Sequence, residues 1–503
     1  MAAREASRMA GSRPNLLFLF SDQHAQHVAG CYGDPLVRTP SLDRLAARGV
    51  VFDNAYCPSP ICVPSRMSML TARHPSAQDC WTNDDFLASD RATWPHALGA
   101  AGYRPVLVSR LHAMGPDQMH GFVARSVGDH SPNYGGVARH DMGPLNDTND
   151  PNRVSVDVSG PGQSSYQLKD METADAAIAA LEDIAARRGA GSNEPFCMSV
   201  GFMLPHPPYV AWPEDYDLYA GRIGMPALPV PEREHPWLAW WRDNRGIADT
   251  RPEDVLRARA AYWGLVTRLD ILVGRVLDRL EALGLAEDTL VVYSSDHGDH
   301  LGERGLWWKH TFHEESVKVP LVLSWPGRLP AGERRAQVVN LVDVTATMLD
   351  ALGAAPLPHA QGTSFLDVAR DARAPWIDET FSEYCTDAVP HWTGGMAVQQ
   401  RMIRSGRWKL VDYNGYRPQL FDLAEDPREL RDLAEDKSHR AVRDALVRKL
   451  RADWDPDAIA ARMRARRRDK DVIGGWARGT RPADQHRWKL EPGQNWIGEA
   501  PPR

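Results

Sequence analysis

The stretch NLLFLFSDQ, residues 15–23, decides the expected fold class. Its first part, Asn15–Ser21, is a nearly uninterrupted apolar run, which is typical of a strand buried on both faces of a parallel sheet. Asp22 and Gln23 follow directly at the carboxyl end of that run. In open α/β sheets, ligands bind outside the carboxyl ends of the strands. The stretch therefore predicts a buried strand with a polar site at its end.

Strand-like and helix-like segments alternate outward from this stretch. Further apolar strands are predicted at residues 104–109, 195–203, 289–295 and 319–327. Helices are predicted at residues 41–49 with Ser41 as the N-cap, and at 93–102, 168–189 and 252–284. This alternation predicts an α/β fold in which a mixed, mostly parallel sheet is sandwiched between helices.

The pattern changes beyond about Trp376. Residues 401–413 resemble two short strands around a tight turn, and 446–454 resemble a helix. We therefore predict a catalytic domain over residues 1–375, a smaller C-terminal α+β subdomain over 376–455, and a tail over 456–503. The tail begins with the charge run ARMRARRRDKD, which is typical of a solvated helix face, with an oligomer contact as the alternative. The Gly-, Pro-, Asp- and Asn-rich stretch 128–163 predicts a surface excursion over a pocket.

The bulk composition limits the class of protein. The chain has 503 residues, of which 43% are hydrophobic and 25% charged, and its formal net charge is −7. Such values fit a globular protein and argue against nucleic-acid or membrane partners. The six cysteines are sparse, and no signal-like or membrane-spanning apolar stretch is apparent. We expect a cytoplasmic protein that forms a homo-oligomer, either a dimer or a tetramer.

Polar side chains recur at the carboxyl ends of four predicted strands. They are Asp22 and Gln23 after the first strand, Arg110 and His112 after 104–109, His206 after 195–203, and Asp296, His297 and, further on, Lys309 after 289–295. The carboxylates, the amide and an imidazole suit a divalent metal ion. The cationic side chains suit a tetrahedral oxyanion and a leaving group that gains charge. Together they predict attack on a phosphoryl or sulfuryl centre.

A second segment, SPICVPSRMSMLTAR at residues 59–73, places a cysteine at the start of a helix. Pro64 suits the first turn of that helix, so Cys62 lies near a helix N-terminus, where anions are stabilised. Arg66 lies about one turn later and can reach back toward Cys62. A thiolate, however, is a poor match for an oxygen-ligated hard metal ion.

The segment CVPSR, followed by MSMLTAR, resembles the CxPSR signature of the type I sulfatases in the alkaline-phosphatase superfamily. The resemblance extends from NLLFLFSDQ to LFDLAEDPRELRDLA. It implies an alkaline-phosphatase-like fold and a sulfuric ester hydrolase that acts on a small-molecule sulfate ester. It also implies that a formylglycine-generating enzyme converts Cys62 to Cα-formylglycine. One hydroxyl of the hydrated aldehyde then attacks sulfur, and the other later expels the sulfate.

The same resemblance implies a role for each site residue. Asp22, Asp296, His297 and residue 62 would hold one divalent ion, with Gln23 at or near it. We expect Ca²⁺ first, with Mn²⁺ or Mg²⁺ as alternatives. Arg66 would support the formylglycine, and Asn83 and Arg110 would contact the transferred group. His112 matches the histidine of the family motif. His206 would contact the ester oxygen, and Lys309 would bind the sulfate and assist the leaving group.

Two departures from the family pattern refine this expectation. SRLH, residues 109–112, stands where the family usually has Gly-Lys-x-His, so Arg110 replaces a lysine, and its planar fork binds an oxyanion differently. SDQ and DHG at the metal positions indicate the branch of choline sulfatases and phosphonate monoester hydrolases. GPDQMHGF, CPSPICVPSR and DHGDHLGERGLWWK are most similar to choline sulfatases.

Two other functions stay open from the sequence. One is a phosphonate monoester or phosphodiester hydrolase that uses the same site, although His112 beside a cationic residue favours sulfate. The other is a non-catalytic protein that binds an anion or a metal and leaves Cys62 unconverted. A dense aromatic cluster, Trp237, Trp240 and Trp241, favours core packing or a subunit contact over a cage for a quaternary ammonium group.

Overall fold

Strand β1 (Asn15–Asp22) lies at the centre of the protein, in a sheet with the strand order β10-β2-β9-β8-β1-β6-β3-β4. The computed structural model describes residues 13–135, 137, 140–149, 151–386 and 398–499. β1 runs parallel to both of its neighbours, β6 (Phe196–Pro205) and β8 (Thr289–Ser295). The other strands of the sheet are β2 (Val50–Tyr56), β3 (Arg104–Ser109), β4 (Ala124–Ser126), β9 (Leu321–Ser324) and β10 (Glu333–Asn340). Because β9 alone runs antiparallel to its neighbours, the prediction of a mixed, mostly parallel sheet is confirmed.

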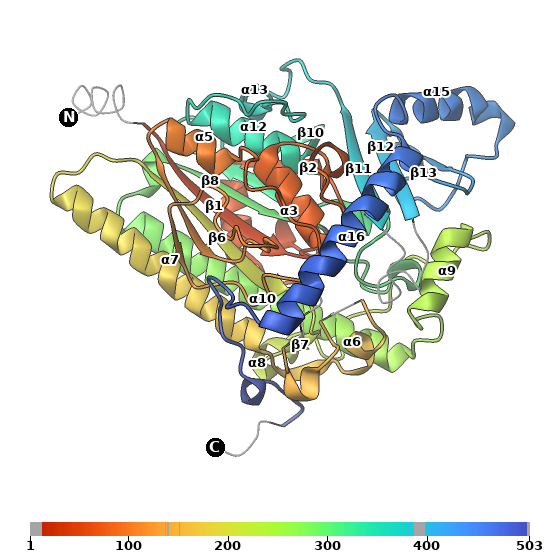
Figure 1. Cartoon of the computed structure of the whole chain (residues 1–503), viewed down its shortest axis with the longest axis horizontal. Coiled ribbons are helices and arrows are strands. Elements are labelled where there is room, and N and C mark those ends of the chain that lie inside the picture. Colours follow the sequence, from red (N-terminus) through yellow and green to blue (C-terminus); the bar gives the residue numbers. More distant parts are fainter. Residues whose placement is uncertain (1–12, 136, 138–139, 150, 387–397, 500–503) are drawn as a thin grey trace.

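The apolar run of β1 is continuous because helices cover both faces of the sheet. Leu16 and Phe18 belong to one core cluster, and Leu17 and Leu19 belong to a second, as the two-residue period of a strand requires. The first cluster lies under α3 (Cys62–Thr71), α5 (Trp94–Ala100) and α12 (Leu341–Ala351). The second lies under α2 (Pro40–Ala47), α7 (Ser165–Gly189) and α10 (Pro252–Ala282), and Figure 1 shows α7 and α10 on the side opposite α3 and α12.

The expected N-cap of α2 is wrong. The helix begins at Pro40, whose ring is preorganised for a first helical position, so Thr39 takes the capping position. Ser41 instead donates its backbone N–H to Asp270 Oδ2 of α10 at 3.0 Å, and Leu42 donates to Asp270 Oδ1 at 2.8 Å. A carboxylate from a neighbouring helix therefore satisfies the amides that a cap would have satisfied.

A second sheet follows the central one in sequence. It is antiparallel, in the order β11 (Glu379–Thr386), β12 (Val398–Ser405), β13 (Trp408–Tyr413) and β14 (Gln419–Asp422), and helix α15 (Arg440–Leu450) packs on it. This agrees with the expected C-terminal α+β subdomain. Helix α16 (Pro456–Thr480) then crosses the front of the molecule in Figure 1, away from β12 and β13 and back toward the central sheet.

The residues after α16 join a small third sheet rather than projecting into solvent. Its strands are ordered β15 (Trp496–Ile497), β5 (Gly160–Gln163) and β7 (Val210–Ala211). Of the aromatic cluster, Trp237 and Trp241 are buried in the first core cluster, as expected for core packing. No helix in the described part of the chain is both long enough and apolar enough to cross a membrane.

Candidate active site

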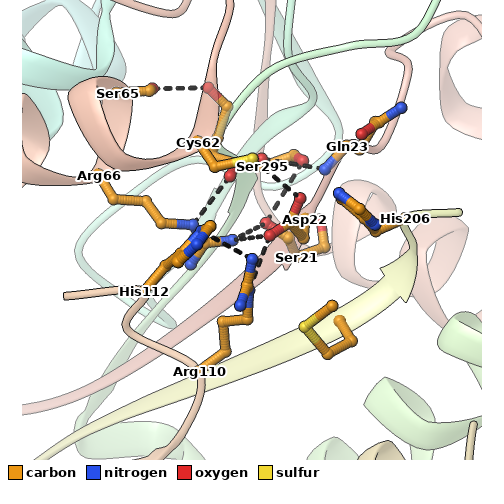
Figure 2. Close-up of polar contacts among 12 residues, drawn as sticks. Ser21, Asp22, Gln23, Cys62, Ser65, Arg66, Arg110, His112, His206 and Ser295 are labelled. Atoms are coloured by element: carbon orange, nitrogen blue, oxygen red, sulfur yellow. Dashed lines mark hydrogen bonds and ion pairs between the residues drawn. The ribbon is translucent and has the colours of Figure 1, made fainter. Parts of the chain in front are cut away.

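Three segments bring four potential metal ligands together at the carboxyl edge of the sheet. Asp22 ends β1, Asp296 and His297 follow β8, and Cys62 opens helix α3. One ligand atom from each of the four lies within 4.8 Å of the others, and all four residues are buried. Cys62 Sγ is 3.2 Å from His297 Nε2 and 3.8 Å from Asp22 Oδ1. Figure 2 shows Cys62 and Asp22 side by side at the centre of the group.

The start of helix α3 holds Cys62 in place without a side-chain cap. Pro64 lies in the first turn, where a missing N–H costs nothing. Ser65 Oγ donates to the carbonyl oxygen of Asp296 at 2.6 Å, and the N–H of Val63 donates to Asn83 Oδ1 at 3.0 Å. The helix N-terminus is therefore tied to β8 by Ser65 and to the following loop by Asn83.

Arg66 forms ion pairs with the carboxylates of Asp22 and Asp296 rather than reaching Cys62. Its Nε donates to Asp296 Oδ2 at 2.8 Å and its Nη2 to Asp22 Oδ2 at 3.1 Å, from a fully buried position. Burial raises the pKa of Asp296 above its usual value, and Arg66 offsets part of that rise. Burial also opposes ionisation of Asp22, but Arg110 and Arg66 hold the pKa of Asp22 well below its usual value. These guanidinium groups keep carboxylate oxygens available in a dry environment.

Lys309 lies between the metal-ligand group and the cavity. Its Nζ is 2.5 Å from Gln23 Oε1, 3.2 Å from Cys62 Sγ and 3.3 Å from His206 Nε2. Burial and then the nearby Lys309 charge lower the pKa of His206 well below its usual value, so this imidazole is neutral. Gln23 also donates its Nε2 to Asp299 Oδ2 at 2.6 Å, which orients its oxygen toward Lys309.

The environment of Cys62 makes an unmodified thiol unreactive. Burial, together with the Asp22 charge, raises the pKa of Cys62 to about 12, and Lys309 offsets only part of the rise. At neutral pH an unmodified thiol here is therefore protonated. Because the thiolate is the nucleophilic and metal-binding form, an unmodified Cys62 is poorly suited to either task.

Arg110 bridges three partners at the opposite side of the group. Its Nε donates to Asp22 Oδ2 at 2.8 Å, its Nη1 to Asp129 Oδ1 at 3.0 Å, and its Nη2 lies 2.7 Å from His112 Nδ1. Burial and the adjacent Arg110 charge lower the pKa of His112 well below its usual value. The expected cluster did not include Asp129, because it lies in the irregular stretch 128–163, where no strand or helix pattern indicates which side chains face the site.

A cavity of about 880 Å³ opens above this group. Its floor contains six of the predicted site residues: Cys62, Asn83, Arg110, His112, His206 and Lys309. The other five, Asp22, Gln23, Arg66, Asp296 and His297, lie beneath that floor, fully or almost fully buried. Much of the wall comes from the excursion 128–163, including His130, Tyr134, Met142, Asn146 and Asn149. The structure thus brings all eleven predicted side chains to one place.

Comparison with known proteins agrees with this geometry. The family model described as Sulfatase matches residues 14–354, and the model described as N-sulphoglucosamine sulphohydrolase, C-terminal, matches residues 302–454. The choline-sulfatase of Rhizobium meliloti is 33% identical over 480 residues, which cover 91% of this chain and 90% of that protein. A multifunctional alkaline phosphatase superfamily protein of Trinickia caryophylli, PehA, is 29% identical and covers 86% of this chain and 93% of its own.

A solved structure shares the same architecture. The phosphonate monoester hydrolase of Silicibacter pomeroyi superposes with a TM-score of 0.70 at 26% identity, over 87% of this chain and 94% of its own. The Sulfatase model extends from the start of β1 to the end of α12, and so includes every strand of the central sheet and every predicted site residue. The chain therefore belongs to the sulfatase family of the alkaline-phosphatase superfamily, as a sulfatase-type hydrolase.

Proposed function

We propose that this protein hydrolyses a small-molecule sulfate monoester and that residue 62 acts as the nucleophile after conversion of Cys62 to Cα-formylglycine. The observation that carries the proposal is the buried group of Asp22, Cys62, Asp296 and His297, whose ligand atoms lie within 4.8 Å of one another. This group lies directly under a cavity whose floor contains two cationic side chains, Arg110 and Lys309.

The donor set fits a divalent metal ion. Two carboxylates, one imidazole and the oxygen of residue 62 would hold it, with the Gln23 amide nearby. Oxygen-rich ligation suits Ca²⁺, Mn²⁺ or Mg²⁺, and the His297 imidazole favours Ca²⁺ or Mn²⁺ over Mg²⁺. A bound ion would supply Lewis-acid activation of the nucleophile and charge neutralisation. Arg66 would hold Asp22 and Asp296 in orientation for that ion.

Conversion of Cys62 explains why a cysteine occupies this position. The thiol has a pKa of about 12, so it is not itself a competent nucleophile at neutral pH. A hydrated aldehyde supplies a hydroxyl group that attacks sulfur and a second hydroxyl group that allows the sulfate to leave by elimination. The formylglycine-generating enzyme is then a required partner during maturation.

The surrounding side chains would bind the transferred group and protonate the alcohol. Arg110 and Lys309 would hold the sulfate oxygens, with Asn83 beside them on the cavity floor. His206 Nε2 is 3.3 Å from Lys309 Nζ, and its depressed pKa keeps it neutral. We therefore assign delivery of a proton to the departing alcohol to Lys309 and orientation of that ammonium group to His206, with His112 as a neutral contact to the sulfate.

The decisive experiment combines mass spectrometry with turnover. Conversion of Cys62 to formylglycine removes about 18 Da from the peptide that contains residue 62. We expect active enzyme to contain that lighter peptide and Cys62→Ala to lose hydrolysis of p-nitrophenyl sulfate. An intact thiol in fully active enzyme, or full turnover by Cys62→Ala, would refute the proposal. An unconverted and inactive wild-type protein would instead support a non-catalytic binding role.

A phosphonate monoester or phosphodiester hydrolase is the second candidate function. It is favoured by the likeness of this chain to the phosphonate monoester hydrolase structure over most of its length. Phosphonate monoesters and sulfate monoesters are both tetrahedral monoanions, so one pocket can accept both. Comparison of kcat/KM for p-nitrophenyl sulfate and p-nitrophenyl phenylphosphonate distinguishes the two. The cytoplasmic location and the dimeric or tetrameric state stay predictions, and sedimentation of the purified protein tests the latter.

A further inference from the structure

Asp129 uses both carboxylate oxygens to hold the Arg110–His112 segment. Its Oδ1 accepts from Arg110 Nη1 at 3.0 Å and from the N–H of His130 at 2.8 Å. Its Oδ2 accepts from the N–H of His112 at 2.7 Å and from the N–H of Leu111 at 3.2 Å. Oδ2 also lies 3.6 Å from Arg125 Nη2. Asp129 is 3% exposed and does not line the cavity, so it acts on the site through the residues that it holds.

These bonds oppose two tendencies of the segment they hold. His112 has a φ of 58°, a left-handed backbone conformation that a residue with a Cβ adopts reluctantly. Arg110 is a long side chain with many rotamers, and ordering it has an entropic cost. Asp129 stabilises the His112 backbone and directs the guanidinium of Arg110 toward Asp22 and His112 at the same time. Its carboxylate therefore determines how two floor residues face the cavity.

The loop that carries Asp129 is itself held by the C-terminal segment, which we define as residues 482–497. Asp129 donates its N–H to the carbonyl of His486 and accepts from the N–H of Trp488, each at 2.8 Å. Asn133, four residues on, donates its N–H to Asp484 Oδ1 at 2.9 Å. The two stretches thus pair like short parallel strands, with Asp129 opposite Arg487.

The C-terminal segment packs closely against the loop that carries Asp129, and Trp488 anchors it. A Cβ placed on Gly128 would lie 2.0 Å from the carbonyl oxygen of His486, so only glycine permits this approach. Trp488 is 8% exposed, packs in a cluster with Met142, Tyr166 and Leu490, and donates its Nε1 to Glu172 Oε2 at 2.8 Å. Met142, Tyr166 and Leu490 also line the cavity, so this cluster connects the C-terminal segment to the cavity wall.

The C-terminal segment lies beyond the regions that the family models match, whereas Asp129 lies within the Sulfatase match. The two matching family models end at residues 354 and 454, before α16 begins at Pro456. The C-terminal segment is therefore not part of either matched region, yet it contacts Asp129, which in turn holds Arg110. The segment can therefore influence Arg110 and His112 through Asp129, in addition to supplying Leu490 to the cavity wall.

We propose that Asp129 is a positioning residue for Arg110 and His112, and that the C-terminal segment, residues 482–497, clamps Asp129 in its working position. The inference rests on the proposed function, because Arg110 and His112 gain their importance from the sulfate they would bind. It assigns no chemical step to Asp129, which acts only by fixing the geometry of its partners.

A double-mutant cycle tests the role of Asp129. We expect Asp129→Asn to lower kcat for p-nitrophenyl sulfate by about 100-fold, as misplacement of binding groups by about 1 Å can do. In the Arg110→Lys background the same change should cost less than about tenfold, because one of the two residues that Asp129 positions is already altered. The matched control is Asp343→Asn, since Asp343 is a buried carboxylate that also accepts backbone N–H bonds and lies outside the cavity lining. Its kcat should stay within about twofold of wild type.

Additive losses in the two backgrounds, or an equal loss of kcat in Asp343→Asn, would overturn the positioning role. A general structural defect would act independently of Arg110 and would appear as a lowered Tm with unchanged kcat. The coupling between Asp129→Asn and Arg110→Lys is therefore the measurement that a merely structural role does not reproduce.

A glycine pair tests the clamp. Gly128→Ala must displace the His486 backbone, whereas Gly479→Ala on α16 meets nothing within 4 Å. We expect Gly128→Ala to lower kcat by about 10- to 100-fold and Gly479→Ala to leave it unchanged. Hydrogen exchange followed by mass spectrometry should show faster exchange at residues 128–133 and 110–112 in Gly128→Ala alone.

The exchange measurement separates failure of this inference from failure of the proposed function. If wild-type protein hydrolyses neither sulfate nor phosphonate esters, the proposed function fails, and faster exchange at residues 110–112 in Gly128→Ala still supports the clamp. If wild-type protein is active but Gly128→Ala matches it in both kcat and exchange, the clamp is refuted and the proposed function stands.

Discussion

At the scale of single residues, Arg110 is the side chain that most distinguishes this site from the family pattern. It donates to Asp22 at 2.8 Å and to Asp129 at 3.0 Å and contacts His112 at 2.7 Å. A lysine at this position has one compact ammonium group on a flexible stem and would not span the same three partners with a fixed geometry. The arginine therefore belongs to a network that includes Asp129.

We expect Arg110→Lys to lower kcat/KM for p-nitrophenyl sulfate by about 10- to 100-fold, since a charge-assisted, multidentate contact is lost. Most of the loss should appear in kcat, because Asp22 also loses one of its two guanidinium partners. Arg335→Lys is the matched control, since Arg335 is also buried but bonds chiefly to the backbone oxygens of Val368 and Ala369, away from the cavity. Retention of wild-type kcat/KM by Arg110→Lys would show that the family lysine suffices here.

Site residues could be predicted from the sequence where they come directly after a regular strand. Asp22, Arg110 and Asp296 were predictable because each follows an apolar strand, and the carboxyl ends of parallel strands meet at one edge. Asp129 was not, because its position depends on a hydrogen-bonded loop rather than on periodicity. The detailed role of Arg66 also differs from expectation, since it pairs with the two buried carboxylates instead of reaching Cys62.

At the scale of elements, predictability again follows burial. Strands β1, β3 and β8 each contain an apolar run, and their bounds agree with the predicted ranges to within one residue, whereas the sequence patterns predict neither β2 nor β10. β10 begins with the charged residues Glu333, Arg334 and Arg335 at the edge of the sheet, so no continuous apolar run marks it. The sequence also does not predict where the chain runs after α16, because the residues that pair with it, such as Asp129, are distant in sequence.

Helix α12 provides a pH-dependent prediction at this scale. Asp343 completes a capping box with Asn340 and also accepts from the N–H of Thr363 at 2.8 Å. Burial raises the pKa of Asp343 to about 7. Because the folded pKa lies above the unfolded value, its contribution to stability is full below about pH 4 and is lost as pH rises toward 7. Asp343→Asn should remove this dependence.

We expect the free energy of unfolding of Asp343→Asn to increase relative to that of wild type by about 1 to 3 kcal/mol between pH 5 and pH 8, because only wild type loses stability over this range. Urea unfolding followed by circular dichroism across that range provides the measurement. Asp350→Asn is the control, because Asp350 lies on the same helix but is exposed. Parallel pH profiles for wild type and Asp343→Asn would contradict the assigned pKa.

At the scale of the whole molecule, a bound metal ion would connect β1, α3 and β8. Removal of that ion would leave Asp22 and Asp296 close together in a buried site, with Arg66 and Arg110 as their remaining cationic partners. We expect exhaustive dialysis against a chelator to abolish turnover and to lower Tm by several degrees, because a ligand that binds only the folded state stabilises it. Re-addition of Ca²⁺, Mn²⁺ or Mg²⁺ separately then identifies the ion.

The Asp296→Asn variant provides the matched control for chelation. It lacks one of the ligands, so its Tm should respond little to the chelator while its fold is retained. A wild-type protein whose turnover and Tm both survive chelation would contradict the assignment of a metal to this group.

The distribution of charge in the cavity predicts which alcohols the enzyme releases. Among the described residues that line the cavity, Arg110 and Lys309 supply the guanidinium and ammonium groups, and both lie on the floor. The walls carry the carboxylates of Asp84, Asp141 and Asp147. The anionic sulfate would bind at the floor, so the alcohol must face the carboxylates. A negatively charged alcohol is therefore repelled, and a cationic one is attracted, with both effects screened by salt.

We expect kcat/KM for aryl sulfates of matched leaving-group pKa to decrease from trimethylammonium to uncharged to carboxylate substituents, by about tenfold overall at low salt, which corresponds to about 1.4 kcal/mol. Raising the ionic strength should compress that range, and Asp141→Asn combined with Asp147→Asn should compress it further. Asp90→Asn, an exposed position that does not line the cavity, should leave the range unchanged. The reverse order of substrates would mean that the alcohol does not face these carboxylates, and it would relocate the leaving-group side of the site to another part of the cavity wall.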